Sequence, residues 1–595
     1  MIRRLPGLLL CAAILLPAGL SADATRDSRK AYLRARAAVA DGRYRDALDQ
    51  YRHVIAILPD DAVVRYEYAQ LLRDLNVPDE AIKQAREAVR LDPNLPEARR
   101  LLGTLEMAAA DQDPSALDRA IEQLTAARRL SPHDTSSAVS LARALLAHGR
   151  AAEAARLLDE LPEARTQPAL LRLTAEARTK AGRLKEAESL YQTLREADPN
   201  DRELMAALID IYEEQDRIDK ALDLLADLQK RDPENPALAE RITLDLARAG
   251  RFEEAEKKAR ELAASRPENR DIRRLLASVL FEKGEVAGGE QILRSLIATD
   301  PDDERSRRTL AVELMRERRF SEARPLLEES ARRGADDPKR REARQAASVE
   351  LGYLAFLQRD YVSARTQLAP LAIANGAVNP RAMRILLGVA RDSEDFAFGL
   401  DRVLTAAAAQ PKSPEWSAAA GEFLWRTGDH AGATRRLEKL GASEDSEEAL
   451  AASDAWSRVK EYAVSARVAG EVVRKNPENT EALFRLASSL ERSGDTAESE
   501  KAFGKLLEAR PADPQTLNYL GYMWADKNVH LEKARAMLER AVARDPRNGA
   551  YQDSLGWVYF RLGKIDLAER HLKNAAEREP DDPTIHEHLG DLAEK

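Results

Sequence analysis

The stretch Tyr551–Pro580, YQDSLGWVYFRLGKIDLAERHLKNAAEREP, decides the fold. Its two helical segments carry small residues, Gly556 in the first and Ala568 in the second, at the points where two packed helices would touch. Small side chains there let the helices approach closely. Pro580 then ends the second helix and starts the next turn. The stretch therefore predicts one tightly packed helical hairpin.

This hairpin pattern recurs along the chain at a fixed period. Prolines lie 34 residues apart from Pro59 to Pro93, from Pro199 through Pro233 and Pro267 to Pro301, from Pro477 to Pro511 and from Pro546 to Pro580. An alanine precedes most of them at the same distance: Ala47, Ala81, Ala187, Ala221, Ala255, Ala534 and Ala568. By size alone, 595 residues would suggest about four compact domains. A fixed period of this length predicts a repeat array instead.

The pattern resembles the tetratricopeptide repeat (TPR). In the last unit the family's signature positions are held by Leu555, Gly556, Tyr559, Gly563, Ala568, Leu572, Ala575 and Pro580. The preceding unit repeats them with Leu520, Gly521, Ala534, Leu538, Ala541 and Pro546. The resemblance covers nearly the whole chain after the N-terminus. It implies an all-α, right-handed superhelical solenoid of about 15–16 helical hairpins, whose first helices line a concave groove.

The regularity of the repeats divides the chain into four predicted parts. Residues 1–24 are a signal peptide, and residues 25–332 form an N-terminal repeat array. In residues 333–476 helical hairpins persist but the signature weakens, which predicts degenerate repeats and a bend or break between lobes. Residues 477–595 form a C-terminal array that ends in a capping helix.

The N-terminus has the features of an export signal. Arg3 and Arg4 precede an apolar run from Leu8 to Leu16, and small residues follow at Ala22 and Ala24. This arrangement is typical of a secretory signal peptide cut near Ala24, although an uncleaved anchor remains an alternative. The single cysteine, Cys11, lies within the apolar run and lacks the small preceding residue of a lipoprotein signal. We therefore expect an exported protein, periplasmic or associated with the cell envelope, with no integral membrane segment after cleavage.

Composition narrows the classes of partner. Charged residues make up 33% of the chain and aromatic residues only 5%, and the formal net charge is −9. Ala, Leu, Arg and Glu dominate, which favours helices. An acidic chain has no general attraction to phosphate backbones, so nucleic acid is not an expected partner.

A search for chemistry finds no recognised catalytic, cofactor or metal motif. The eight histidines are scattered, and no His-Glu-x-x-His or Cys-x-x-Cys spacing occurs. The acidic run Asp300–Glu304 lacks the glycine and terminal glutamate of a calcium loop and lies at a repeat boundary, where Asp and Pro cap helices. The sequence therefore predicts a protein that is not an enzyme and needs no cofactor or metal.

The groove of the C-terminal repeats is the predicted partner site. The TPR resemblance assigns the following residues to the concave face: Phe484, Ser488, Glu491, Arg492, Asn518, Tyr522, Asp526, Asp553, Trp557, Phe560 and Arg561. Aromatic rings beside Arg and Asp suit an extended peptide or a partner helix. All five tryptophans also lie in the C-terminal part of the chain. The alternative, that these rings fill gaps between hairpins, stays open.

Three functions from different classes follow. The first is a non-catalytic protein–protein interaction scaffold or adaptor of the bacterial cell envelope, because the C-terminal repeats look like those of large bacterial TPR adaptors at the outer membrane. The second is a periplasmic scaffold of an exopolysaccharide synthesis and export complex. The third is an enzyme with an unrecognised site in residues 333–476.

Overall fold

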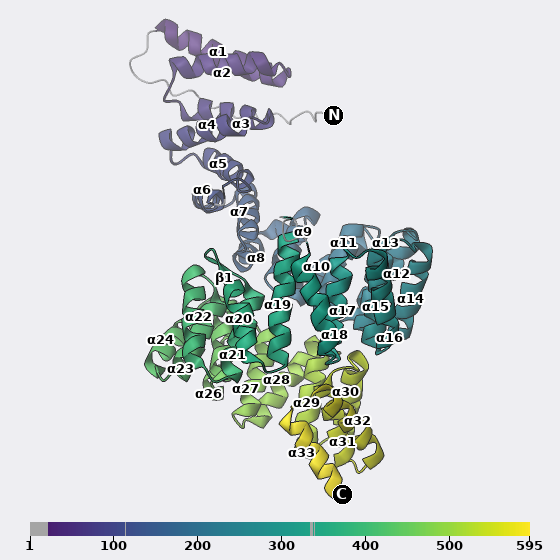
Figure 1. Ribbon diagram of the computed structural model, residues 1–595. Helices are drawn as coiled ribbons and strands as arrows, with labels where there is room; N and C mark the ends of the chain where they lie inside the picture. Colours follow the sequence, from purple (N-terminus) through teal and green to yellow (C-terminus); the bar gives the residue numbers. More distant parts are fainter. Residues whose placement is uncertain (1–21, 114, 334–336, 338–339) are drawn as a thin grey trace. The chain divides into compact units, whose positions relative to one another are not determined.

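A computed structural model describes residues 22–113, 115–333, 337 and 340–595, and almost all of it is α-helix (Figure 1). The predicted signal peptide, Cys11 included, lies outside these residues except for its last three positions. Helices pair in chain order as antiparallel hairpins, α1 with α2 through α31 with α32, and α33 follows the last pair. The all-α repeat fold predicted from the sequence is confirmed. None of the described helices is long and apolar enough to cross a membrane.

The chain forms two compact units that meet between Leu204 and Met205. The first unit holds α1 (Ala22–Ala40), α2 (Tyr44–Ile57), α3 (Ala62–Asp74), α4 (Pro78–Leu91), α5 (Pro96–Ala108), α6 (Ala116–Leu130), α7 (Thr135–Ala147), α8 (Ala151–Asp159), the 3-10 helix η1 (Pro162–Arg165), α9 (Pro168–Lys180) and α10 (Leu184–Ala197). The predicted divisions at 332/333 and 476/477 both fall inside the second unit.

The second unit continues the same hairpins. Its helices are α11 (Arg202–Glu214, which begins just before the boundary), α12 (Ile218–Arg231), α13 (Pro236–Arg248), α14 (Phe252–Ser265), α15 (Arg270–Lys283), α16 (Val286–Thr299), α17 (Glu304–Arg316), α18 (Phe320–Arg332), α19 (Arg341–Leu357), α20 (Tyr361–Ala372), α21 (Pro380–Asp392), α22 (Phe396–Ala409), α23 (Pro414–Arg426), α24 (His430–Gly441), α25 (Ser446–Arg458), α26 (Tyr462–Lys475), α27 (Thr480–Arg492), α28 (Thr496–Ala509), α29 (Pro514–Asp526), α30 (Leu531–Arg544), α31 (Gly549–Arg561), α32 (Ile565–Arg578) and α33 (Pro583–Glu594). A short antiparallel pair, β1 (Ile373–Ala374) and β2 (Ala377–Val378), joins α20 to α21.

Small residues fix the distance between the helices of a hairpin. A Cβ added at Gly556 of α31 would lie 2.7 Å from Cγ of Leu572 in α32. At Gly521 of α29 the same atom would lie 2.8 Å from Cγ of Leu538 in α30. Both distances are far below van der Waals contact, so any larger residue would push the two helices apart. The sequence predicts that these glycines allow the two helices of a hairpin to approach closely, and this is confirmed.

Polar caps and prolines set the helix ends. Asn548 accepts a hydrogen bond from the backbone N–H of Tyr551 at the start of α31. Asp582 does the same for Thr584 and Ile585 at the start of α33. Pro580 follows the last residue of α32 by two positions. These caps satisfy N–H groups that have no partner inside the helix, and the proline prevents the helix from continuing.

A buried carboxylate joins three successive first helices of the middle repeats. Glu422 of α23 is fully buried and accepts hydrogen bonds from Arg391 of α21, at 2.7 and 2.9 Å, and from Arg426 one turn further along α23, at 3.1 Å. A nitrogen of Arg458 in α25 lies 3.7 Å from the same carboxylate. Charge-assisted bonds of this kind, held away from water, are stronger than those at an exposed surface.

A second buried carboxylate, that of Asp245, lies between α11 and α13 and is only partly paired. Asp245 is 2% exposed, and its Oδ2 has no hydrogen-bond partner among the described residues. Burial, followed by the nearby charge of Glu213, raises the pKa of Asp245 to about 7, although Arg248 and Arg241 act in the opposite direction. The folded state therefore keeps a proton on Asp245 at pH values where an unfolded chain has released it.

Glu422→Gln is expected to lower the free energy of unfolding by about 2–3 kcal/mol, because it leaves partly buried guanidinium groups without a counter-charge. The matched control is Glu415→Gln in the same helix, whose carboxylate pairs with Arg384 at side-chain exposures of 40% and 62%. That exposed pair should contribute only ~0–1 kcal/mol. Urea denaturation of the two variants measures the difference. Equal losses would show that Glu422 does not hold the helices together.

Asp245→Asn is expected to remove a pH dependence of stability. Since the folded pKa is raised, wild-type stability falls as pH rises between about 4, the ordinary value of an unfolded Asp, and about 7. The neutral asparagine should make the variant the more stable protein at pH 8, with no advantage at pH 4. Urea midpoints at both pH values check this. Asp210→Asn, at a side chain that is 65% exposed, is the control and should keep the wild-type slope.

Candidate partner-binding surface

A cleft of about 750 Å³ opens in the second unit where α17, α19 and α21 face the turn between α32 and α33. Its lining is Val312, Met315, Arg316, Arg318, Phe320, Glu350, Tyr353, Leu357, Arg381, Arg578, Glu579, Asp581, Asp582 and Pro583. Apolar side chains on one wall thus face a charged turn on the other. The cleft has the size that ligand sites commonly have.

The apolar wall includes a side chain that the fold leaves in solvent. Val312 of α17 is 39% exposed and lies beside Tyr353 and Leu357 of α19 in the lining. Two repeat periods earlier, at the equivalent position of α13, Leu244 is 50% exposed. Val312 is therefore available for contact with another molecule, together with the apolar side chains that line the same cleft.

The arginines that line the cleft face carboxylates. Arg318 donates to Asp581 at 3.3 Å, and Arg381 donates to Glu350 at 2.9 Å. Burial lowers the pKa of Arg578, which also lines the cleft. Burial, followed by the charge of Asp582, raises the pKa of Glu579. An apolar side chain can therefore dock against Val312 while polar groups of the same partner meet charges at the rim.

Three of the predicted groove residues are covered in this structure. Asp553 is 6%, Trp557 5% and Phe560 8% exposed. The ring of His588 in α33 stacks on Trp557 with a centroid distance of 4.0 Å, and its Nδ1 lies 2.9 Å from Oδ1 of Asp553. The sequence predicted an open surface at these positions, and the correction is that the capping helix packs directly onto them.

The other predicted groove residues are at least partly accessible. Phe484 and Tyr522 are half-buried, and Arg492 and Asp526 are exposed. Phe484 packs edge-on against Phe503 and Tyr519, both 5.9 Å away between ring centroids. Asn518 is half-buried, and its Oδ1 has no hydrogen-bond partner among the residues that the structure describes. Arg561 is also half-buried, and its guanidinium lies 5.5 Å from the centre of the Trp557 ring. The structure gathers these residues on successive first helices, and their binding role stays a prediction.

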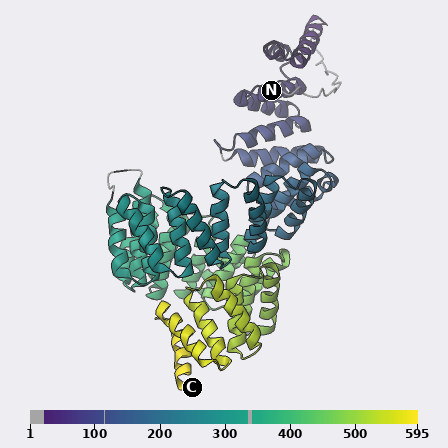
Figure 2. The ribbon, with the colours of Figure 1, turned by 90° about the vertical axis from the view of Figure 1, so that its right-hand side faces the viewer.

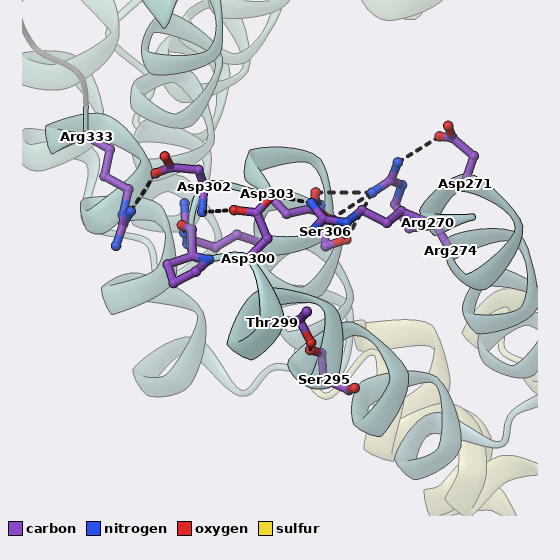
Figure 3. Close-up of polar contacts among 12 residues, drawn as sticks. Arg270, Asp271, Arg274, Ser295, Thr299, Asp300, Asp302, Asp303, Ser306 and Arg333 are labelled. Carbon is purple, nitrogen blue, oxygen red and sulfur yellow. Dashed lines mark hydrogen bonds and ion pairs between the residues drawn. The ribbon is translucent and has the colours of Figure 1, made fainter. Parts of the chain in front are cut away.

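The acidic run at the start of α17 is held by arginines (Figure 3). Arg274 donates to Asp303 at 2.9 and 3.1 Å, and Asp303 in turn accepts from the backbone N–H of Ser306 as the helix cap. Arg340 and Arg333 hold the pKa of Asp302 at about 2. Asp303 thus has the capping role that the sequence predicts, and the pairing of this run with arginines is an additional finding of the structure.

Sequence reasoning missed Val312, Leu244 and Tyr353. A signal for two of them was present, because Leu244 and Val312 are separated by two repeat periods and occupy the groove register used for the C-terminal repeats. Tyr353 does not follow Val312 at the 34-residue spacing, because the connection before α19, residues 333–340, is longer than in most other repeats.

Comparisons with known proteins agree with the hairpin architecture. Two tetratricopeptide repeat models match residues 38–105, 113–177, 178–240 and 246–312, and residues 308–380, 449–514, 484–548 and 554–595. The TPR repeat-containing protein PA4667 of Pseudomonas aeruginosa is 33% identical over 121 residues. That match spans 20% of this chain and 20% of the relative, so the chain covers a fifth of that protein's length.

The solved structures that match this chain are more distant in sequence. Naa15/Naa10 bound to HypK-THB is 17% identical over 96% of each chain, with a TM-score of 0.33. A thermophilic TPR protein of Thermus thermophilus is 20% identical over 31% of this chain and 98% of its own, with a TM-score of 0.25. The repeat models, however, match more than half of this chain and fall on its helical hairpins. The protein therefore belongs to the tetratricopeptide repeat family.

Proposed function

We propose that the protein is a non-catalytic protein–protein interaction scaffold of the bacterial cell envelope, and that it holds its partner at the cleft between α17, α19 and the α32–α33 turn. Tetratricopeptide repeats bind proteins in general, which supports the scaffold class. The observation that carries the choice of site is the exposed Val312 in a cleft of about 750 Å³.

The chemistry of the cleft favours a peptide or helix over a small polar ligand. Val312, Tyr353 and Leu357 offer apolar area that an aliphatic or aromatic side chain of the partner would bury. Arginines and carboxylates at the rim would fix the register of the bound segment. Leu244, in the equivalent position of α13, offers a second anchor further along the same face of the repeats.

The envelope assignment rests on the predicted signal peptide and on similarity to a bacterial relative. The adaptor and exopolysaccharide hypotheses share this location and differ in the partner. Recovery of a processing protease or its substrate would favour an outer-membrane adaptor, whereas recovery of a polysaccharide synthase or an outer-membrane porin would favour the export complex.

Val312→Asp is expected to reduce partner recovery at least tenfold, because a carboxylate would replace the apolar contact at the centre of the cleft, a loss of about 1.4 kcal/mol or more. Val362→Asp is the matched control, since Val362 on α20 is 77% exposed and lies outside the cleft. Affinity capture from periplasmic extract with quantitative mass spectrometry measures recovery. The cleft is not the site if both variants recover the same proteins in the same amounts.

Export is tested by fractionation of cells that produce the full chain. The envelope assignment predicts protein in the periplasmic or membrane fraction, shortened by about 24 residues as intact mass would show. Replacing Leu8–Leu10 with Asp should trap the full-length chain in the cytoplasm, because a charged segment cannot enter the export machinery. Wild-type protein found full-length in the cytoplasm would refute the assignment.

A further inference from the structure

Two sets of turns, more than 200 residues apart in sequence, touch within the second unit. The first set lies at the ends of α11, α13, α15 and α17, and the second follows α28, α30 and α32. The contacts run from Arg510 to the carbonyl of Glu214, from Arg544 to Asp216, from Arg547 to Phe281, Glu313 and Glu317, from Arg316 to Asp545, and from Arg318 to Asp581. We call these contacts the seam. Both ribbon views show the last helices, in olive and yellow, beside the teal helices α15–α18 (Figures 1 and 2).

Arg547 is the most enclosed charged residue of the seam. Its side chain is 1% exposed, although it lies in the turn between α30 and α31. It donates to the carbonyl of Phe281 at 2.9 Å, and to Glu313 and Glu317 at 2.9 and 2.7 Å. The carbonyl of Phe281 belongs to the last turn of α15 and also accepts from the backbone N–H of the cap residue Gly284 at 2.9 Å. One guanidinium thus contacts a helix end and pairs two carboxylates across the seam.

The seam is polar, unlike the packing along the repeats. The buried apolar clusters around α15–α19 and around α29–α32 are each made by neighbouring helices, with members from Ala277 to Leu354 in one and from Ala525 to Ala568 in the other. Neither cluster has a buried member from the other side of the seam. Ion pairs and hydrogen bonds exchange with water far more evenly than apolar contacts do. These two clusters can therefore stay intact when the sides separate.

The two walls of the cleft come from opposite sides of this seam. Val312 and Tyr353 belong to the α17–α19 wall, whereas Glu579 and Asp582 belong to the α32–α33 turn. Arg318 and Asp581 line the cleft and also bond across the seam. Opening the seam would therefore draw the two walls of the cleft apart.

We propose that the seam is a polar latch that switches the second unit between a closed form, in which the cleft is assembled, and an open form, in which it is not. This regulation rests on the proposed function for its consequence, since the cleft is the partner site there. The latch itself is independent of any partner. Three arginines recur at the repeat period, because Arg510, Arg544 and Arg578 lie 34 residues apart at or just after the ends of successive second helices. A nitrogen of Arg578 lies 3.9 Å from Glu317.

Two glycines allow the latch to be tested without disturbing either wall of the cleft. Gly250 and Gly563 both adopt a φ of +73° in the turn of a hairpin, so an alanine carries the same backbone strain at each. A Cβ at Gly250 would lie 2.5 Å from the carbonyl oxygen of Ala543 across the seam, whereas a Cβ at Gly563 meets nothing within 4 Å. Gly250→Ala should therefore open the seam, and Gly563→Ala is its matched control.

The opening is measured as a distance in the full chain. Nitroxide labels on Glu253→Cys in α14 and Lys533→Cys in α30, in a Cys11→Ser background, report across the seam by double electron–electron resonance. We expect Gly250→Ala to shift the distance distribution to longer values, and Gly563→Ala to leave it as in the unsubstituted chain. Equal distributions for the two variants would overturn the latch.

Charge reversal gives a second check that adds no Cβ at a glycine. Asp216→Arg and Arg544→Asp should each lengthen the distance, and the double variant should restore it, because the pair at 2.5 Å is re-formed with opposite polarity. Failure of the double variant to restore the distance would count against the latch.

Partner recovery separates the latch from the proposed function. Gly250→Ala should lower recovery of whatever proteins Val312→Asp loses, and Gly563→Ala should not. A lengthened distance with undiminished recovery would overturn the link between latch and cleft. If Val312→Asp loses no protein, the proposed site fails, whereas the distance measurements still decide the latch.

Discussion

The whole structure depends on one constraint, which is that a hairpin of this chain cannot bury its apolar surface alone. Its two helices touch at a small residue, as at Gly556 against Leu572, and the remaining apolar faces are covered only by the hairpins before and after. Stability is therefore built from neighbour to neighbour. The same constraint explains why aromatic residues are few, since large rings fit only where two hairpins leave room for them.

The fold was readable from the sequence because this constraint repeats. The period, the small residues at Gly521 and Ala534, and the prolines after most second helices were enough to predict the hairpins and their order. The capping helix was predicted as well, but its effect was not. The repeat pattern does not predict that His588 stacks on Trp557, because that contact occurs once, at the end of the array.

The candidate site was harder to predict because it, too, depends on contacts that do not recur from repeat to repeat. Repeat register places Val312 on the correct face of its helix, but it does not say that the α32–α33 turn lies opposite, since that proximity joins residues more than 200 apart in the sequence. The partners of Arg547 come from α15 and α17, and nothing in the local sequence of its turn points to them. Local rules predict the repeats, whereas contacts between distant repeats depend on small rotations that accumulate from hairpin to hairpin.

If this repeat array holds a protein at the cleft beside Val312, that protein lies within reach of a crosslinker at this position. The measurement replaces Val312 with a photo-crosslinking amino acid and irradiates intact cells that produce the chain at native level. We expect a covalent adduct to a discrete envelope protein from position 312 and none from position 362 on α20. Absence of an adduct at position 312, or the same products at both positions, would contradict this expectation.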